Sequence, residues 1–128
     1  MCGIVGGVTE RNIVPILLEG LHRLEYRGYD SAGIAFKERE NVSLVKSLGR
    51  VHDLEKKLDK EAISNIGIAH TRWATHGIPS EKNAHPHASN KNIYVVHNGI
   101  IENHEDLKSE LKSEGFKLYS QTDSEVIG

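Results

Sequence analysis

The fold is indicated first by residues 1–28, which read MCGIVGGVTERNIVPILLEGLHRLEYRG. Three apolar residues near the amino end predict a short buried strand: Ile4, Val5 and Val8. Asn12 is a suitable N-cap for a helix that has Pro15 in its first turn, and Gly28 would end that helix. One apolar helix face is expected, formed by Val14, Leu17, Leu18, Leu21 and Leu24. The chain therefore opens with a strand that leads into an amphipathic helix.

Hydrophobic periodicity predicts the elements that follow. They are a hairpin with strands at 32–36 and 42–46, a helix over about 51–60, strands at 66–70 and 93–96, and a helix around Leu107 and Leu111. Thr122 and Glu125 have capping-box spacing and predict one more helix. This alternation predicts an α+β or α/β class with a mixed sheet. The loop at 72–92 is longer than an idle connection and is expected to carry function.

Composition excludes several classes of function. The chain has 128 residues, 38% hydrophobic and 27% charged, with a formal net charge of −2 and no basic cluster, so no nucleic-acid partner is expected. No apolar run is long enough to span a bilayer, and no export signal is present, so no membrane partner is expected. A single cysteine cannot form an internal disulfide and fits a cytoplasmic location. The glycine-rich start lacks phosphate-loop spacing, and no cofactor is expected.

Cys2 follows the initiator methionine directly. Removal of Met1 would give Cys2 both a thiol and a free α-amine. The ordinary pKa of a cysteine thiol is about 8.5 and that of an α-amine is about 8. Such an amine can accept the thiol proton near neutral pH, directly or through one water molecule. Cys2 is therefore a candidate nucleophile. The alternative is a small buried residue at the start of a strand.

Three further groups of residues suit acyl-transfer chemistry. Asn98 and Gly99 follow a predicted strand and can supply an amide and a backbone N–H to an oxyanion, although Asn-Gly is also a common turn. Residues 72–77, RWATHG, combine an arginine able to bind a carboxylate with a hydroxyl, an imidazole and the only tryptophan; the alternative is a surface loop. Asp123 suits an ammonium group, or it is an acidic residue in the first turn of a helix.

Metal binding is the competing hypothesis, because five of the eight histidines lie close in sequence: His70, His76, His85, His87 and His97. His85 and His87 would point to the same side of an extended segment. No H-E-x-x-H motif accompanies them, so no metal site is predicted, and a metal-dependent hydrolase stays an alternative.

Six segments in order resemble one family: MCGIVGG, LHRLEYRGYDSAG, HTRWATHG, NAHPH, HNGIIEN and TDSEVIG. They are similar to the class II glutamine amidotransferases, which are N-terminal-nucleophile hydrolases. Within that class, EYRGYDSAG and HTRWATHGIPSEKNAHPH resemble the glutaminase domains of the glucosamine-6-phosphate synthases, the isomerising glutamine–fructose-6-phosphate aminotransferases. The resemblance implies an α+β fold, the four-layer αββα sandwich, of which residues 1–128 would be only the N-terminal portion.

The resemblance also implies a role for each matching residue. Cys2 would attack the side-chain amide of L-glutamine with its own α-amine as the base, and Asn98 with the N–H of Gly99 would form the oxyanion hole. The α-carboxylate of glutamine would be held by Arg72, Thr75 and His76, with Trp73 alongside. Asp123 would bind the α-ammonium group. Arg27 and Gly28 would help to orient the amino terminus.

The implied reaction releases ammonia, which an absent C-terminal sugar-isomerase domain would use to convert fructose 6-phosphate to glucosamine 6-phosphate. An alternative is an inactive fragment that binds glutamine or self-associates. With later strands missing, apolar surface is expected at Ile4, Val5, Ile34, Phe36, Ile68, Val95 and Ile101, and a homo-oligomer is expected.

Overall fold

The computed structural model describes residues 1–74 and 77–128. Its elements in chain order are β1 (Gly3–Val8), α1 (Ile13–Leu24), η1 (Glu25–Arg27), β2 (Ser31–Glu38), β3 (Asn41–Leu48), α2 (Val51–Lys57), β4 (Ile66–Arg72), β5 (His87–Ser89), β6 (Ile93–Val95), α3 (His104–Ser113) and η2 (Ser124–Ile127), where η marks a 3-10 helix. Helices and strands are mixed along the chain, as expected for the α+β class, but every described strand pair is antiparallel, so the predicted mixed sheet is wrong.

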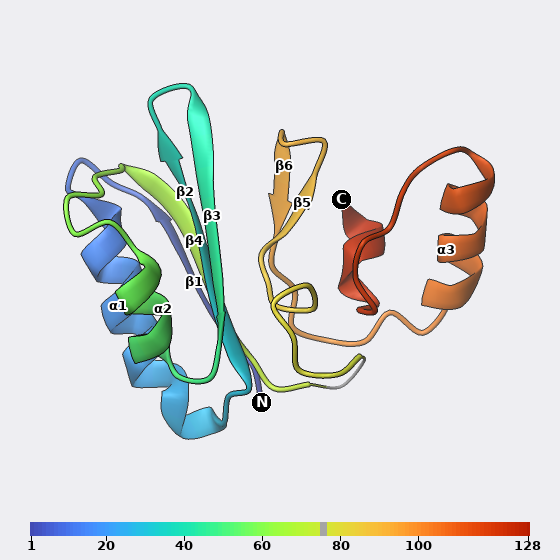
Figure 1. Ribbon diagram of the computed structural model, residues 1–128, viewed down its shortest axis with the longest axis horizontal. Coiled ribbons are helices and arrows are strands. Elements are labelled where there is room, and N and C mark those ends of the chain that lie inside the picture. Colours follow the sequence, from blue (N-terminus) through green and yellow to red (C-terminus); the bar gives the residue numbers. More distant parts are fainter. Residues whose placement is uncertain (75–76) are drawn as a thin grey trace.

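The described strands form two sheets. The larger has the order β1-β4-β2-β3 with every neighbouring pair antiparallel, and β5 pairs with β6 in a separate hairpin. Helices α1 and α2 lie on one side of the larger sheet, whereas the hairpin, η2 and then α3 lie on the other (Figure 1). Helices, sheet, sheet and helix therefore follow one another across the molecule, which is the layer order expected for an αββα sandwich.

The first helix forms where the sequence predicts it. The Oδ1 atom of Asn12 accepts the backbone N–H of Val14 at 3.2 Å, which satisfies one free donor of the first turn. The Nδ2 atom of Asn12 also donates to the carbonyl of Ala62 at 3.0 Å, so the same side chain ties the helix to the segment before β4. After α1 and η1, the chain turns at Gly28, whose φ of 97° favours glycine.

The apolar core lies between these helices and the larger sheet. Its fully buried members include Leu17 and Leu21 of α1, Ile34 of β2, and Val51 and Leu54 of α2. They pack as a single cluster, which accounts for the predicted apolar faces of both helices.

The opposite face of the sheet is approached closely by the chain that leads into β5. A Cβ atom at Gly33 would lie 1.8 Å from the carbonyl oxygen of His85, so only glycine permits this contact between the two layers. Gly33 pairs in register with His70 of β4, and both residues therefore lie on this face.

Several expectations from the sequence are wrong in detail. Val8, expected in a buried strand, is exposed, because β1 is an edge strand and this part of its face is uncovered; Ile4 is exposed on the same face, as expected when later strands are absent. Ile34 and Phe36 are buried against α1 and α2, so they do not add to the exposed apolar surface. The expected long loop contains β5. Thr122 and Glu125 form no capping box, because Glu125 instead accepts the N–H groups of residues 119 and 120.

Candidate active site

Residues predicted to carry chemistry line one cleft of about 560 Å³. Cys2 enters it from the start of β1, Arg72 and Trp73 from the end of β4, and the remainder from the segments that follow β6 and precede η2. The predicted residues that the structure brings together here are Cys2, Arg72, Trp73, Asn98, Gly99 and Asp123. Thr75 and His76, the other two predicted substrate contacts, lie outside the described residues.

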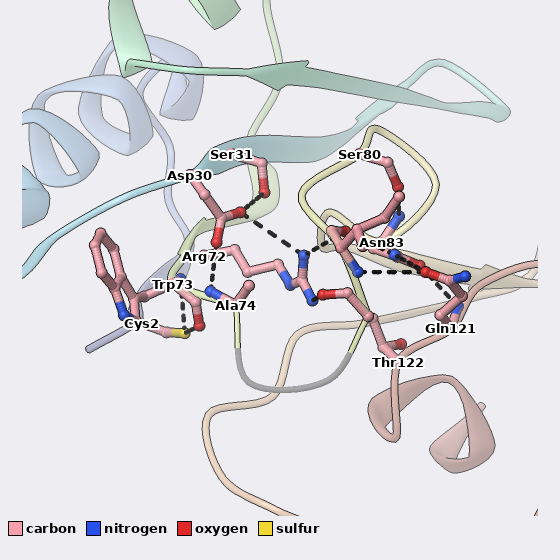
Figure 2. Close-up of polar contacts among 12 residues, drawn as sticks. Cys2, Asp30, Ser31, Arg72, Trp73, Ala74, Ser80, Asn83, Gln121 and Thr122 are labelled. Atoms are coloured by element: carbon pink, nitrogen blue, oxygen red, sulfur yellow. Dashed lines mark hydrogen bonds and ion pairs between the residues drawn. The ribbon is translucent and has the colours of Figure 1, made fainter.

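The sulfur of Cys2 is held by the backbone of Trp73. The N–H of Trp73 donates to Sγ at 3.2 Å, and Sγ lies 3.5 Å from the carbonyl oxygen of the same residue (Figure 2). Strands β1 and β4 are paired from Gly3 and Thr71, so the register of the sheet sets this contact.

The amino terminus is anchored beside the cleft. The ammonium group of Met1 donates to the carbonyl oxygen of Arg27 at 2.7 Å, and Arg27 also lines the cleft. Gly28 lies against the ring of Trp73, where an added Cβ atom would be 2.9 Å from Cε3. The segment 27–28 is therefore next to the chain start.

The segment after β6 places an amide in the same cleft. The Oδ1 atom of Asn98 lies 2.8 Å from Nε2 of His70, which is fully buried on β4. Gly99 has a φ of 151°, and a Cβ atom there would approach the imidazole of His97 at 3.0 Å, so a glycine is required at this turn. Sequence reasoning identified Asn98 and Gly99 but considered His70 only as a metal ligand.

Arg72 has a structural role that sequence reasoning missed. Its side chain is buried, its Nη1 and Nη2 atoms donate to the carbonyl oxygens of Ile78 and Gly77 at 3.3 and 3.1 Å, and Nη1 lies 3.7 Å from Oδ1 of Asp30. Asp30 in turn accepts the backbone N–H of Ala74 (Figure 2). The pair therefore fixes both sides of the loop that follows β4. The only sequence signal for Asp30 was its place inside the segment YRGYDSAG.

Asn83 joins this loop to the segment before η2. Its Nδ2 atom donates to the carbonyl oxygen of Ile78 at 2.8 Å and to Oε1 of Gln121 at 3.0 Å, and its Oδ1 atom accepts the N–H of Gln121 at 2.7 Å. Figure 2 shows these contacts beside the guanidinium of Arg72. Asn83 belongs to the segment NAHPH, and no role was predicted for Asn83 itself.

Asp123 is buried at the rim of the cleft. One carboxylate oxygen accepts the N–H of Ile101 at 2.7 Å, and the other lies 3.4 Å from the hydroxyl of Ser124. Asp123 is the N-cap residue of η2, although its side chain makes no capping hydrogen bond there. The carboxylate instead joins η2 to the chain that follows Gly99.

The buried histidines of the described chain lie close together. The rings of His70 and His85 stack with centroids 4.2 Å apart, and the ring of His87 lies 4.5 Å from that of His85. Burial lowers the pKa of His70 and of His87 to about 4 and also lowers that of His85. Within residues 1–74 and 77–128, no group of three His, Cys, Asp or Glu side chains could hold a metal ion, so the metal alternative has no support.

No helix in the described part of the chain combines the length and apolar character needed to cross a bilayer.

Comparison with known proteins gives consistent results. The sequence model of a family described as "Glutamine amidotransferase domain" matches residues 57–128. A glutamine–fructose-6-phosphate aminotransferase (isomerizing) of Pseudomonas aeruginosa is 58% identical, and one of Pseudomonas syringae is 61% identical, each over 99% of this chain and 21% of the relative. The chain therefore spans about one fifth of the length of these relatives.

Solved structures show the same fold. A glutamine phosphoribosylpyrophosphate amidotransferase from B. subtilis superposes with a TM-score of 0.83 at 26% identity, and an allosteric regulatory enzyme of purine biosynthesis with a TM-score of 0.80 at 28% identity. The matches cover 99% and 98% of this chain and 28% of each solved chain. They confirm the expected α+β fold of the N-terminal-nucleophile hydrolases. By its sequence, with its fold in agreement, this chain belongs to the glutamine amidotransferase domain family.

Proposed function

We propose that this chain hydrolyses the side-chain amide of L-glutamine through a γ-glutamyl thioester on Cys2 and releases ammonia. The observation that carries the proposal is the convergence of Cys2, Asn98, Gly99 and Asp123 on one cleft. These residues come from opposite ends of the chain, and no local motif would place a thiol, an amide and a carboxylate together. Each has a function in acyl transfer from an amino-acid amide.

The reaction begins with Met1 removed, so that the α-amine of Cys2 is free. Sγ attacks the amide carbon of glutamine as its proton passes to that amine, and the new oxyanion accepts hydrogen bonds from Nδ2 of Asn98 and the N–H of Gly99. When the intermediate collapses, the carbon–nitrogen bond breaks and the ammonium returns the proton to the departing ammonia. Water, deprotonated by the same amine, then cleaves the thioester to glutamate and regenerates the thiol.

Recognition of the zwitterionic end of glutamine is assigned to the rim of the cleft. The carboxylate of Asp123 suits the α-ammonium group, and the guanidinium of Arg72, with Thr75 and His76, suits the α-carboxylate. Trp73 forms a wall of the cleft beside the nucleophile. Since Arg72 already holds the carbonyl oxygens of Gly77 and Ile78, it supports the loop as well as the substrate.

We further propose that residues 1–128 are the N-terminal portion of a type 2 glutamine amidotransferase domain within a longer cytoplasmic protein. The relatives of about five times this length support this proposal. In the longer protein, ammonia would pass to C-terminal sugar-isomerase domains that convert fructose 6-phosphate to glucosamine 6-phosphate. The exposed apolar residues Ile4, Val8 and Ile66 on one face of β1 and β4 favour a homo-oligomer for the isolated chain.

The test is substitution of Cys2 by alanine in the full natural polypeptide with Met1 removed. Glutamine hydrolysis should fall to background, whereas synthesis from fructose 6-phosphate with high concentrations of free ammonia should persist. Persistence of glutamine hydrolysis in Cys2→Ala would refute the nucleophile. The alternative of an inactive fragment is separate: it predicts that residues 1–128 alone bind glutamine without releasing ammonia, while the longer protein is active.

A further inference from the structure

A buried histidine contacts the carboxamide of Asn98, which lines the same cleft as Cys2. His70 lies on β4, two residues before the arginine of the cleft, and its side chain is fully buried. Its Nε2 atom lies 2.8 Å from Oδ1 of Asn98, whereas its Nδ1 atom is buried and has no hydrogen-bond partner in the described part of the chain. One face of the His70 ring stacks against the ring of His85, with the two ring centroids 4.2 Å apart.

These contacts determine which nitrogen carries the proton. Burial keeps the imidazole neutral, although hydrogen bonds to Asn98 and to the backbone of His97 act to raise its pKa, so it has one N–H. If that proton were on Nδ1, a buried donor would be left without a partner, which is costly. With the proton on Nε2, the imidazole donates to the Oδ1 atom of Asn98, and the unprotonated Nδ1 atom has no donor to satisfy.

The tautomer in turn determines the orientation of the amide. A carboxamide oxygen that accepts from His70 is held away from the cleft, and the NH₂ group of Asn98 is left to face it. The reverse arrangement would direct a carbonyl oxygen at a developing negative charge. Accepting a hydrogen bond at oxygen also polarises the amide and makes its NH₂ group a stronger donor.

We infer that His70 is a positioning residue that sets the Asn98 carboxamide with its NH₂ group toward the acyl oxyanion formed on Cys2. The inference rests on the proposed glutamine hydrolysis and adds a residue to it. His70 does not contact the substrate. It acts through Asn98, and its effect is therefore on the transition state in which the oxyanion exists, with little effect on the binding of glutamine.

The kinetic test compares His70→Leu, which removes the donor, with His70→Gln, whose amide N–H lies near the position of Nε2. In the full natural polypeptide with Met1 removed, His70→Leu should lower kcat for ammonia release by about tenfold to a hundredfold, less than the about 10²–10³-fold loss for removing an oxyanion donor. KM should change less than about threefold, because ground-state binding is unaffected. His70→Gln should recover most of kcat. Unchanged kcat in His70→Leu, or a change in KM alone, would overturn the inference.

A double-mutant cycle separates positioning from general loss of structure. In an Asn98→Ala background, His70→Leu should have no further effect on kcat, because the group that it orients is gone. An equal loss of kcat in both backgrounds would show that His70 acts independently of Asn98. If the parent protein releases no ammonia from glutamine, the proposed function fails, whereas the tautomer can still be measured.

The tautomer is measured by ¹⁵N NMR of histidine-labelled parent protein, and comparison with His70→Gln assigns the His70 signals. A protonated Nε2 and an unprotonated Nδ1 at neutral pH are expected. A proton on Nδ1 would reverse the carboxamide and overturn the inference, whatever the kinetics show. Because the tautomer is measured on the parent protein, it tests the inference even if His70→Leu does not fold.

Discussion

The two faces of the four-stranded sheet differ in what they bury. The face under α1 and α2 buries an apolar cluster around Leu17, Leu21 and Ile34. The opposite face buries polar side chains, among them Ser31, His70, Arg72, Asn83, His85, His87 and Thr122. One sheet therefore has a face that buries apolar side chains and a face that buries polar ones, and the candidate site lies on the polar face.

The difference is one of directionality. Apolar contacts on the helical face are non-directional and depend mainly on the area that they remove from water. Polar groups on the other face need a partner at a set distance and angle, or burial destabilises them. Distant parts of the chain supply those partners. The hydroxyl of Thr122 lies 2.8 Å from Nε2 of His87, and the Nδ2 atom of Asn83 donates to the side chain of Gln121. A substitution should therefore affect stability on one face and activity on the other.

Leu17→Ala should have the largest effect on folding. Leu17 is fully buried under the sheet, and its truncation should lower the free energy of unfolding by about 2–5 kcal/mol through lost burial and a residual cavity. Urea denaturation measures the change. Ile16→Ala on the same helix is the matched control, since Ile16 is exposed and should change stability by about 0.5 kcal/mol or less. Equal losses would mean that α1 does not pack as described.

Gly33→Ala should affect both stability and activity, because it would force the His85 segment away from the sheet. The added Cβ atom meets a backbone carbonyl oxygen, so the free energy of unfolding should fall by about 1–3 kcal/mol. Glutamine hydrolysis should fall further than this loss of stability explains, because His85 also lines the cleft. Gly6→Ala is the control: its nearest neighbour would be at an ordinary 3.4 Å. A fully active Gly33→Ala variant would contradict the close contact of the layers.

Asp123→Asn should affect binding and leave folding nearly unchanged. The carboxamide oxygen can still accept the N–H of Ile101, but the charge that would bind the α-ammonium group is lost. A charge-assisted bond contributes about 1.5–3 kcal/mol, so KM for glutamine should rise roughly tenfold to a hundredfold. Steady-state kinetics and thermal unfolding on the same preparation test this. An unchanged KM with a lowered Tm would make Asp123 a structural residue.

The smallest effect is expected on the helical face, where His22 bridges two helices. Its Nδ1 and Nε2 atoms lie 3.0 and 2.8 Å from carboxylate oxygens of Glu25 and Glu55, and His52 lies 3.7 Å from Glu55. The hydrogen bond to Glu55 is the main cause that raises the pKa of His22 above its ordinary 6.5. The imidazolium should contribute less than about 1 kcal/mol, because the side chain is 36% exposed.

The sign of this pH dependence follows from the raised pKa. The stabilisation is complete below pH 6.5, provided that the glutamates stay ionised, and is lost as pH rises through the pKa of folded His22. The difference in unfolding free energy between the parent and His22→Gln should therefore be present near pH 6 and shrink at alkaline pH. A difference that grows with pH would have the wrong sign. Glutamine hydrolysis should not follow this difference, because His22 lies on the helical face.

The sequence predicted the helical face better than the polar one. Periodicity located α1, the β2–β3 hairpin and α2, because an amphipathic helix and a paired strand leave their pattern in neighbouring residues. The exposure of Val8 and the burial of Phe36 were not predictable, since each depends on which layer covers that part of the sheet.

The chemical residues were identified by resemblance, but their contacts were not. Nothing near Asp30 indicates that it accepts a hydrogen bond from Ala74, and nothing near His70 indicates that it meets Asn98. Such pairs are joined only by the register of β2, β4 and the chain after β6. Arg72 was interpreted as a substrate ligand, whereas its bonds to Gly77 and Ile78 add a role that only the structure reveals.

The most direct test of Cys2 as an amino-terminal nucleophile is intact mass before and after a glutamine-analogue electrophile. The purified natural protein should lack Met1 and gain one adduct per chain on Cys2. Excess glutamine should block the adduct, and neither Cys2→Ala nor a form that retains Met1 should acquire it. An adduct on another residue, or equal labelling and ammonia release by the form that retains Met1, would contradict a nucleophile activated by its own α-amine.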